Sequence, residues 1–326
     1  MDHDLYLYRA LRPTVPDSRP QRPLGHVGHG PADALTAGAS PEVQAGRLQA
    51  FVVLFLEHWD AEPAPGQLRD PRLVGEYGSF TPDYRSWTQR EYGLRIGIFR
   101  VIDALQGAGL TPAVAANARA VQRLPQLVDR LQRLGCEWVA HGLAATDILH
   151  SRMLLDAQRE HVCASLDALQ AATGVRPQGW LSQDWGTTPQ TWQILADAGV
   201  RYVLDWCNDD QPYALRTSPP LHAVPLSAEW DDVQCQWLRH LEPQRHATLT
   251  LEAFDHLRGE CATWGRDAVF GLPVHPWVTG MSSRIATFKR LLSDLRSRDD
   301  VQWTLPGQIR AHRSPTGICP QPALAP

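Results

Sequence analysis

The fold is predicted from one stretch, residues 191–213, which reads TWQILADAGVRYVLDWCNDDQPY. Residues 191–198 suit a helix, and Gly199 stands where that helix would end. Glycine readily adopts the left-handed conformation that stops a helix. Residues 200–204 follow at once as an apolar strand, and Pro212 closes the polar turn after it. The stretch therefore predicts a helix, a glycine stop and a strand in immediate succession.

The same order recurs three times before this stretch. Gly109, Gly135 and Gly174 each follow an apolar helical face and precede a short apolar run. The three faces are formed by Ile98, Val101, Ile102 and Leu105, by Leu127, Val128, Leu131 and Leu134, and by Leu155, Val162, Leu166 and Leu169. The strands are predicted over residues 111–116, 136–140 and 178–182. Strands that alternate with helices form a parallel sheet with right-handed crossovers.

The folded part begins at a fully apolar run, Ala50 to Leu56, which has the length and composition of a buried strand. Later strands are predicted over residues 222–226, 269–274 and 301–305, with a helix on the face of Ile285, Phe288, Leu292 and Leu295. Residues 61–91 and 227–250 are predicted to be loops. Seven or eight such units are enough to close an α/β barrel.

Length and composition restrict the class of protein. The 326 residues fit one barrel domain over 46–314, with a flexible N-terminal extension over 1–45 and a C-terminal tail over 315–326. A net charge of −4 argues against nucleic acid or an anionic membrane as partner. Six scattered cysteines without a CxxC pair, and no apolar leader or run of transmembrane length, lead us to expect a cytoplasmic protein.

Polar residues follow almost every predicted strand. They are Glu57 and His58, Asn117, His141, the run Ser182, Gln183 and Asp184, the run from Asp205 to Asp210, and His275. In barrels the carboxyl ends of the strands meet at one face, where sites are built. We therefore expect these side chains to converge on one site.

The chemistry that suits this set is hydrolysis. A buried carboxylate beside imidazoles can act as general base on water, and a second histidine can protonate a leaving nitrogen or stabilise an oxyanion. No glycine-rich phosphate loop follows a strand, so nucleotide binding is not indicated. Cys207 beside Asp205 is interpreted as incidental, because a single thiol in a loop is a weak signal.

Five motifs together resemble the polysaccharide deacetylase (NodB-homology) family, and within it the branch of metal-independent allantoinases and cyclic imide hydrolases. They are Tyr92-Gly93-Leu-Arg95-Ile-Gly97, Ala140-His141-Gly142, Arg176-Pro177-Gln-Gly179-Trp180-Leu, the run from Asp205 to Tyr213, and Val274-His275-Pro276. The resemblance covers residues 48–312 in order. It implies an α/β fold of the NodB-like type, a distorted (β/α) barrel with seven or eight strands, together with hydrolysis of amide carbon–nitrogen bonds and a homo-oligomer.

The resemblance also implies roles for individual residues. Glu57 and His58 stand where deacetylases carry an aspartate pair that serves as base and metal ligand. His141 matches the first histidine of the metal motif His-x-x-x-His, but Ala145 occupies the second histidine's position. Asp205-Trp206 resembles the fourth motif, and His275 the fifth, whose histidine acts as general acid.

The departure at Ala145 bears on the metal. A hydrolytic zinc site usually has three protein ligands and one open position. Glu57 and His141 supply two, and His58 or His150 would have to supply the third. We predict no tightly held metal; if a divalent metal such as zinc is present, we expect it on Glu57, His58 and His141. Without a metal, the site would need a more activated carbonyl than an ordinary acetamide.

We therefore predict a hydrolase of a small cyclic amide, imide or ureide. Glu57 would be the base, His141 and His275 the acid or oxyanion partners, and Asp205 the partner of a catalytic histidine. The predicted substrate contacts are Trp180, Trp206, Asn208, Asp209, Asp210, Tyr92 and Asn117. Asp231 and Asp232 are interpreted as a solvated turn. Two alternatives stay open: a metal-dependent N-deacetylase of an amino sugar or modified metabolite, and a non-catalytic barrel that binds a ligand.

Overall fold

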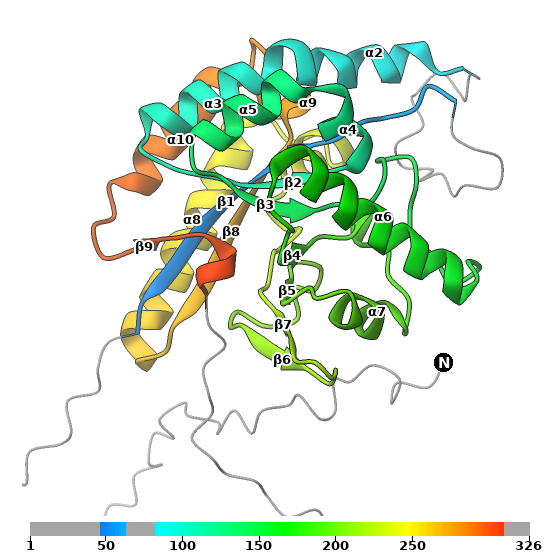
Figure 1. The fold of residues 1–326 in the computed structure, drawn as a ribbon. Coiled ribbons are helices and arrows are strands. Elements are labelled where there is room, and N and C mark those ends of the chain that lie inside the picture. Colours follow the sequence, from blue (N-terminus) through cyan, green and yellow to red (C-terminus); the bar gives the residue numbers. More distant parts are fainter. Residues whose placement is uncertain (1–45, 63–81, 310–326) are drawn as a thin grey trace, which may run out of the picture.

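The structure is a computed structural model that describes residues 46–62 and 82–309 (Figure 1). The predicted extension over 1–45, the tail over 315–326 and most of the predicted 61–91 loop lie outside these ranges. Among the described residues, no helix is long and apolar enough to cross a membrane.

One curled sheet organises the fold, and its strands lie side by side in the order β6-β7-β5-β4-β3-β2-β1-β8, with β9 also paired to β1. The strands are β1 (Leu48–Leu56), β2 (Ala113–Ala116), β3 (Glu137–Ala140), β4 (Gly179–Trp180), β5 (Tyr202–Val203), β6 (Tyr213–Leu215), β7 (Leu221–Ala223), β8 (Ala268–Val274) and β9 (Gln302–Trp303). All pairs are parallel except β6 with β7. The predicted distorted (β/α) barrel is confirmed, and each of the eight predicted strands is present.

Helices cover the outer face of the sheet (Figure 1). They are α2 (Tyr84–Tyr92), α3 (Ile98–Gly107), α4 (Ala118–Arg123), α5 (Pro125–Arg133), α6 (Leu155–Thr173), α7 (Thr191–Asp197), α8 (Pro243–Trp264), α9 (Pro276–Thr279) and α10 (Ile285–Arg296). Short π- or 3₁₀-helical pieces are η3 (Gly93–Gly97), η4 (Gln183–Trp185), η5 (Val233–Leu238) and η6 (Pro306–Gln308).

Strand β1 is apolar from Ala50 to Leu56, where both of its faces are buried. Leu54 and Leu56 belong to the core between sheet and helices, while Val53 and Phe55 belong to the core inside the curl. Side chains alternate between the two faces of a strand. Glu57, two residues after Phe55, is therefore the next inward-facing position.

The glycine stops behave as the sequence predicts. Gly109, Gly135, Gly174 and Gly199 all have positive φ, between 66° and 88°, at the ends of α3, α5, α6 and α7. Glycine adopts this conformation without the steric cost that a Cβ would add. The helix-to-strand connections stay short as a result.

Two predicted loops contain regular structure, which corrects the sequence prediction. The 227–250 segment holds η5 and the start of α8, whose Pro243 lies in the first turn, where its missing N–H costs nothing. The 61–91 segment holds most of α2, which begins where the Asp83 carboxylate accepts a hydrogen bond from the Ser86 N–H at 3.0 Å. The antiparallel strand β6 was not predicted.

Candidate active site

Strand register brings Glu57, Asn117 and His141 into one row. Leu56 pairs with Ala116, and Ala116 pairs with Ala140, so the residue after each strand lies one step beyond the last paired row. All three side chains are buried. The prediction that the strand ends converge is confirmed for Glu57 and His141.

The Glu57 carboxylate is held through one of its two oxygens. Its Oε1 accepts a hydrogen bond from Gln183 Nε2 at 2.9 Å and lies 3.3 Å from His141 Nε2. His141 Nδ1 lies 2.6 Å from the Leu181 carbonyl oxygen, to which it donates. Oε2 of Glu57 has no partner among the described residues and is left to meet water or substrate.

Glu57 is ionised at neutral pH. Burial alone would raise its pKa, but the hydrogen bond from His141 and the charges of His275 and His141 outweigh burial and lower the pKa to about 2. The buried carboxylate is thus partnered, as a buried charge must be.

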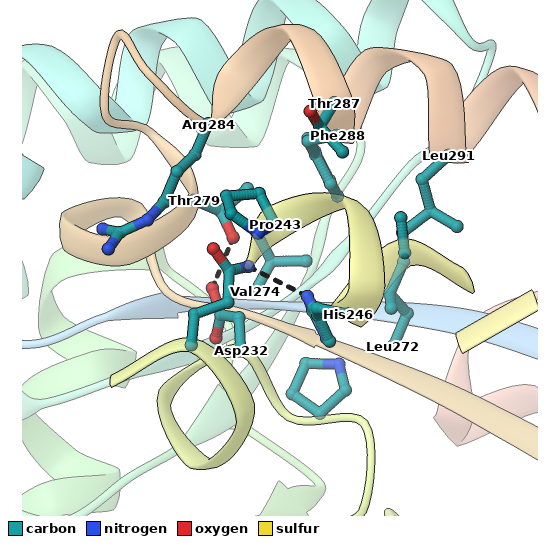
Figure 2. A pocket seen from close by; sticks show the side chains of 13 residues that line it. Asp232, Pro243, His246, Leu272, Val274, Thr279, Arg284, Thr287, Phe288 and Leu291 are labelled. Atoms are coloured by element: carbon teal, nitrogen blue, oxygen red, sulfur yellow. Dashed lines mark hydrogen bonds between the residues drawn. The ribbon is translucent and has the colours of Figure 1, made fainter. Parts of the chain in front are cut away.

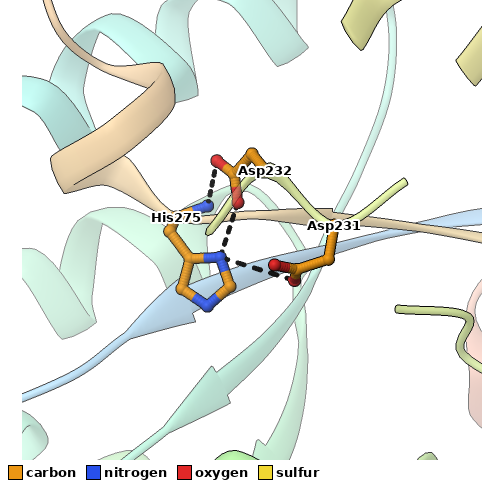
Figure 3. Close-up of side chains that lie close together, drawn as sticks. All are labelled: Asp231, Asp232 and His275. Atoms are coloured by element: carbon orange, nitrogen blue, oxygen red, sulfur yellow. Dashed lines mark hydrogen bonds and ion pairs between the residues drawn. The ribbon is translucent and has the colours of Figure 1, made fainter. Parts of the chain in front are cut away.

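His275 follows β8, the strand next to β1, and is held by an aspartate. Its Nδ1 lies 2.6 Å from Asp232 Oδ1 and 3.8 Å from Asp231 Oδ2 (Figure 3). Asp232 Oδ2 in turn accepts from the His275 backbone N–H at 2.9 Å and from Thr279 Oγ1 at 2.5 Å. Nδ1 therefore carries its proton towards Asp232, and Nε2 is the nitrogen that points away from the carboxylates.

His275 is protonated at neutral pH. Burial would lower its pKa, but the negative charges of Asp232 and Asp231 and the hydrogen bond to Asp232 raise it to about 9. Burial raises the pKa of Asp231 to about 6, and the charge of Asp232 adds to that effect.

The interpretation of Asp231 and Asp232 as a solvated turn is wrong. Each carboxylate is only 1% exposed, and both face His275. Forty-three residues separate Asp232 from His275, and no spacing rule joins them. The available signal was chemical: a buried catalytic histidine needs an orienting carboxylate, and Asp232 stands in the predicted 227–250 loop.

Asp205 does not partner a catalytic histidine, which corrects that prediction. Its two carboxylate oxygens accept from the Ser182 backbone N–H at 2.5 Å and the Ser182 hydroxyl at 2.9 Å. Leu204, one residue earlier, faces the inside of the curl, so Asp205 faces the helix side. Burial raises the pKa of Asp205 to about 7, against the effect of the two Ser182 hydrogen bonds.

Asn117 fixes backbone positions around the site. Its Oδ1 accepts from the His58 N–H at 3.0 Å, and its Nδ2 donates to the His141 carbonyl oxygen and, at 3.4 Å, to Gln183 Oε1. These bonds occupy both ends of the amide. The geometry assigns it to positioning, where the sequence predicted a substrate contact.

The predicted substrate contacts from Asn208 to Asp210 lie away from Glu57. The Val269 N–H donates to the Asp210 carbonyl oxygen at 2.8 Å, which places the run from Asn208 to Asp210 beside the start of β8. His275 follows the other end of that strand, roughly 20 Å away at about 3.3 Å per residue. This contradicts their predicted role.

The two tryptophans and Tyr92 also have other contacts. Trp180 is fully buried in the core between sheet and helices, and Trp206 packs edge-on against Trp192 with ring centroids 4.4 Å apart. The Tyr92 hydroxyl accepts from Arg100 Nη1 at 2.7 Å. These contacts account for all three residues as packing and helix-junction residues.

Gln183 is a functional residue that the sequence reasoning placed at a strand end but did not select. It follows Leu181 by two residues and so shares its inward face, where it reaches Glu57. The next two residues, Asp184 and Trp185, have φ of 48° and 52°, which is strained for side chains other than glycine. The alternation of side chains along and after β4 was the signal that could have identified Gln183 as a site residue.

In the described part of the chain, the pair of Glu57 and His141 is not completed to a three-ligand zinc centre. Glu57 and His141 offer two donors, and Ala145 offers none at the expected third position. His58 turns elsewhere: its Nε2 lies 3.2 Å from Asp60 Oδ1, and its Nδ1 lies 2.7 Å from Arg123 Nη1. The alternative metal set of Glu57, His58 and His141 is therefore not assembled.

One carboxylate-rich group does gather three donor atoms within 4.8 Å of one another in the described chain, namely Asp231, Asp232 and His275. Both carboxylates there face the same imidazole nitrogen, at 2.6 and 3.8 Å. A proton on Nδ1 satisfies that geometry, and the group acts as an ion pair.

A separate pocket lies behind Asp232, between α8, α10 and β8 (Figure 2). Leu272 and Val274 line it, and these residues face the helix side of β8. Within it His246 bridges Gln236 Nε2 and the Trp230 carbonyl oxygen, each at 2.9 Å. The pocket therefore backs the site and lies on the other face of β8 from the His275 ring.

Comparison with known proteins agrees with this architecture. No family model matches the chain. A Schizosaccharomyces pombe protein named as a candidate polysaccharide deacetylase is 24% identical over 228 residues, which are 65% of this chain and 70% of that protein.

Two solved structures share the fold over most of their length. A candidate polysaccharide deacetylase from Pseudomonas aeruginosa has a TM-score of 0.70 at 23% identity and covers 80% of this chain and 89% of its own. The Puue allantoinase has a TM-score of 0.70 at 22% identity and covers 85% and 95%. These comparisons show a shared fold, because the chain folds like this candidate deacetylase and this allantoinase. This polysaccharide deacetylase fold places Glu57, His141 and His275 at the carboxyl ends of β1, β3 and β8.

Proposed function

We propose that the protein hydrolyses a carbon–nitrogen bond of a small cyclic amide, imide or ureide, with Glu57 as general base and His275 as general acid. One observation carries the proposal. Neighbouring strands β1 and β8 present a carboxylate with a pKa of about 2 and an imidazole with a pKa of about 9. At neutral pH the first is ready to take a proton and the second to give one.

The residues perform the reaction as follows. Oε2 of Glu57 takes a proton from water as the water oxygen adds to the carbonyl carbon. His275 supplies positive charge for the oxyanion that forms, and His141 orients the Glu57 carboxylate beside it. Nε2–H of His275 then protonates the leaving nitrogen as the carbon–nitrogen bond breaks. The products are a carboxylic acid and the released amide nitrogen, still joined through the opened ring.

The low pKa of Glu57 favours an activated substrate. A carboxylate with a pKa of about 2 is a weak base, so it gives little help to attack on an unreactive amide. An imide or ureide carbonyl is more electrophilic, because its nitrogen shares its lone pair with a second carbonyl group. Beside Glu57 and His141, the described residues offer no third ligand for a metal ion, which is the group that would activate an ordinary acetamide.

Relatives support the same class of bond. The names of the similar proteins describe deacetylases and an allantoinase, which both cleave carbon–nitrogen bonds of amides. From these names we take only the class of bond that is cleaved. The preference for a cyclic, activated substrate rests on the site residues of the present chain.

The test is a panel of cyclic imides, ureides and N-acetyl sugars, assayed with and without chelator. Glu57→Gln and His275→Gln should each lower the rate on the best substrate by about 100-fold or more. Asp210→Asn and His256→Gln are matched controls, because Asp210 lies at the far end of β8 and the His256 side chain is 74% exposed on α8.

Two outcomes would replace the proposal. Loss of acetate release on chelation would favour the metal-dependent N-deacetylase. Unchanged activity of Glu57→Gln and His275→Gln on every substrate would favour a non-catalytic barrel.

A further inference from the structure

Arg90 lies beside the catalytic strand ends although it takes no part in the proposed chemistry. It belongs to α2 and is only 3% exposed. Its guanidinium is stacked between the rings of Trp59 and Trp277, 4.3 Å from each centroid. Trp59 follows Glu57 by two residues, and Trp277 follows His275 by two. The stack is thus anchored on the same two strands as the base and the acid.

One edge of this guanidinium has no protein partner. Nη1 donates to the Ser86 carbonyl oxygen at 3.2 Å, one turn earlier in its own helix. Within the described chain Nε has no hydrogen-bond partner and no carboxylate pairs with Arg90. The indole N–H groups of Trp59 and Trp277 are likewise buried without a partner among the described residues.

The charge of Arg90 is costly where it lies. Burial lowers its pKa to about 10, against the attraction of Glu57 and Asp83, so the side chain is still cationic at neutral pH. A buried cation without a hydrogen-bonded anion is unfavourable. Glu57 attracts Arg90 electrostatically, but no hydrogen bond or ion pair joins the two side chains in the described part of the chain.

We propose that Arg90, Trp59 and Trp277 form a carboxylate-binding subsite, and that the substrate carries a carboxylate next to its reactive amide. The free Nε–Nη2 edge has the parallel N–H geometry that binds a carboxylate through two hydrogen bonds. The two indole rings hold the guanidinium plane fixed, so little side-chain entropy is lost on binding. This subsite deepens the proposed function, on which its assignment to a substrate rests.

Binding of two matched probes tests the subsite without any reaction. Succinamate carries a carboxylate and an amide, and succinamide is its uncharged counterpart. In calorimetric titrations the wild type should bind succinamate at least 10-fold more tightly than succinamide. Equal affinities would overturn the proposal, and this comparison depends on no variant.

Two variants then locate the effect. Arg90→Met keeps the packing between the indoles and should weaken succinamate binding about 10-fold or more, with succinamide unchanged. Arg90→Lys keeps the charge but loses the planar fork, so its affinity for succinamate should lie between that of the wild type and that of Arg90→Met. Arg130→Met is the control, because Arg130 also lies over an aromatic ring, that of Phe99, but pairs with Asp103 at 2.8 Å. Equal losses in Arg90→Met and Arg130→Met would refute the assignment.

Activity separates this subsite from the proposed function. With a cyclic imide that bears a carboxymethyl group and its neutral carboxamide analogue, Arg90→Met should raise KM for the first only. If both imides were hydrolysed with the same change in KM, the carboxylate subsite would be refuted and the proposed hydrolase function would stand. Selective binding of succinamate without hydrolysis of any substrate would support the subsite and refute the proposed hydrolase function.

Discussion

The imidazole of His275 lies flat on the ring of Phe55, with centroids 3.8 Å apart and planes 15° apart. The same phenyl ring meets His141 edge-on at 5.3 Å. Phe55 therefore supports both histidines from the inward face of β1, one step below Glu57. The aromatic core inside the curl is in this way continuous with the catalytic row.

Phe55→Leu should lower kcat by more than its loss of stability explains. The change removes the flat support under His275, so we expect kcat to fall about 10-fold, while unfolding free energy falls by about 1–3 kcal/mol. Phe51→Leu changes another fully buried phenylalanine of the same inner core and should cost similar stability with little loss of kcat. Urea unfolding and steady-state kinetics measure the two effects. Equal kcat in both variants would contradict a supporting role for Phe55.

Asp232→Asn should move the alkaline limb of the pH–rate profile. His275 must be protonated to act as an acid, so the wild-type rate should fall as pH rises through about 9. Removing the Asp232 charge removes the largest contribution that raises this pKa against burial, so the limb should move to lower pH. The measurement is kcat/KM from pH 5 to 10.

Asp231→Asn is the matched control for that profile. Asp231 Oδ2 lies 3.8 Å from Nδ1, against 2.6 Å for Asp232 Oδ1, so its removal should move the limb less. An alkaline limb that stays in place in Asp232→Asn would exclude His275 as the titrating acid.

Much of the fold followed from the sequence because its signals are local. A glycine at positive φ ends a helix whatever surrounds it, and apolar runs such as Ala50 to Leu56 are long enough to be recognised as strands. The helices within 227–250 were missed because that segment has mixed composition and a proline, which is tolerated in a first helical turn.

The site was predicted less well because residue type alone does not fix direction. Glu57 and His275 share the inward face, whereas Asp205 faces outward although it also follows a strand. One residue of difference in parity reverses the face. Pairing of Asp232 with His275 depends on a contact across 43 residues, which only the folded chain creates.

Glu57 should contribute to acid stability. Its pKa is lowered from 4.5 to about 2 in the folded protein, so its contribution is present above pH 4.5 and is lost as pH falls towards 2. A lowering of the Glu57 pKa from 4.5 to about 2 corresponds to about 3 kcal/mol. Between pH 4.5 and 2, Glu57→Gln should therefore lose less stability than the wild type in urea unfolding. Glu252→Gln, an exposed change on α8, should lose as much as the wild type.

Asp205→Asn should affect stability and leave catalysis nearly unchanged, in contrast to Glu57→Gln. Asp205 contacts Ser182 on the helix side of β5, so we expect kcat to stay within about threefold of wild type while Glu57→Gln loses about 100-fold. At pH 4 the Asp205 carboxyl is protonated, and replacing one of its oxygens by an amide NH2 loses a hydrogen bond from Ser182, which should cost about 1–2 kcal/mol of unfolding free energy.

The pH dependence of this variant has a definite sign. Burial raises the pKa of Asp205 from 3.8 to about 7, so ionisation destabilises the folded wild type as pH rises through that range. Asparagine does not ionise, so the stability deficit of Asp205→Asn should shrink and then reverse between pH 4 and 7, and should level off above that range. Urea unfolding at pH 4, 5.5, 7 and 8 measures the trend. A deficit that stays level from pH 4 to 8 would show that Ser182 holds Asp205 ionised throughout, because its two hydrogen bonds would then outweigh burial.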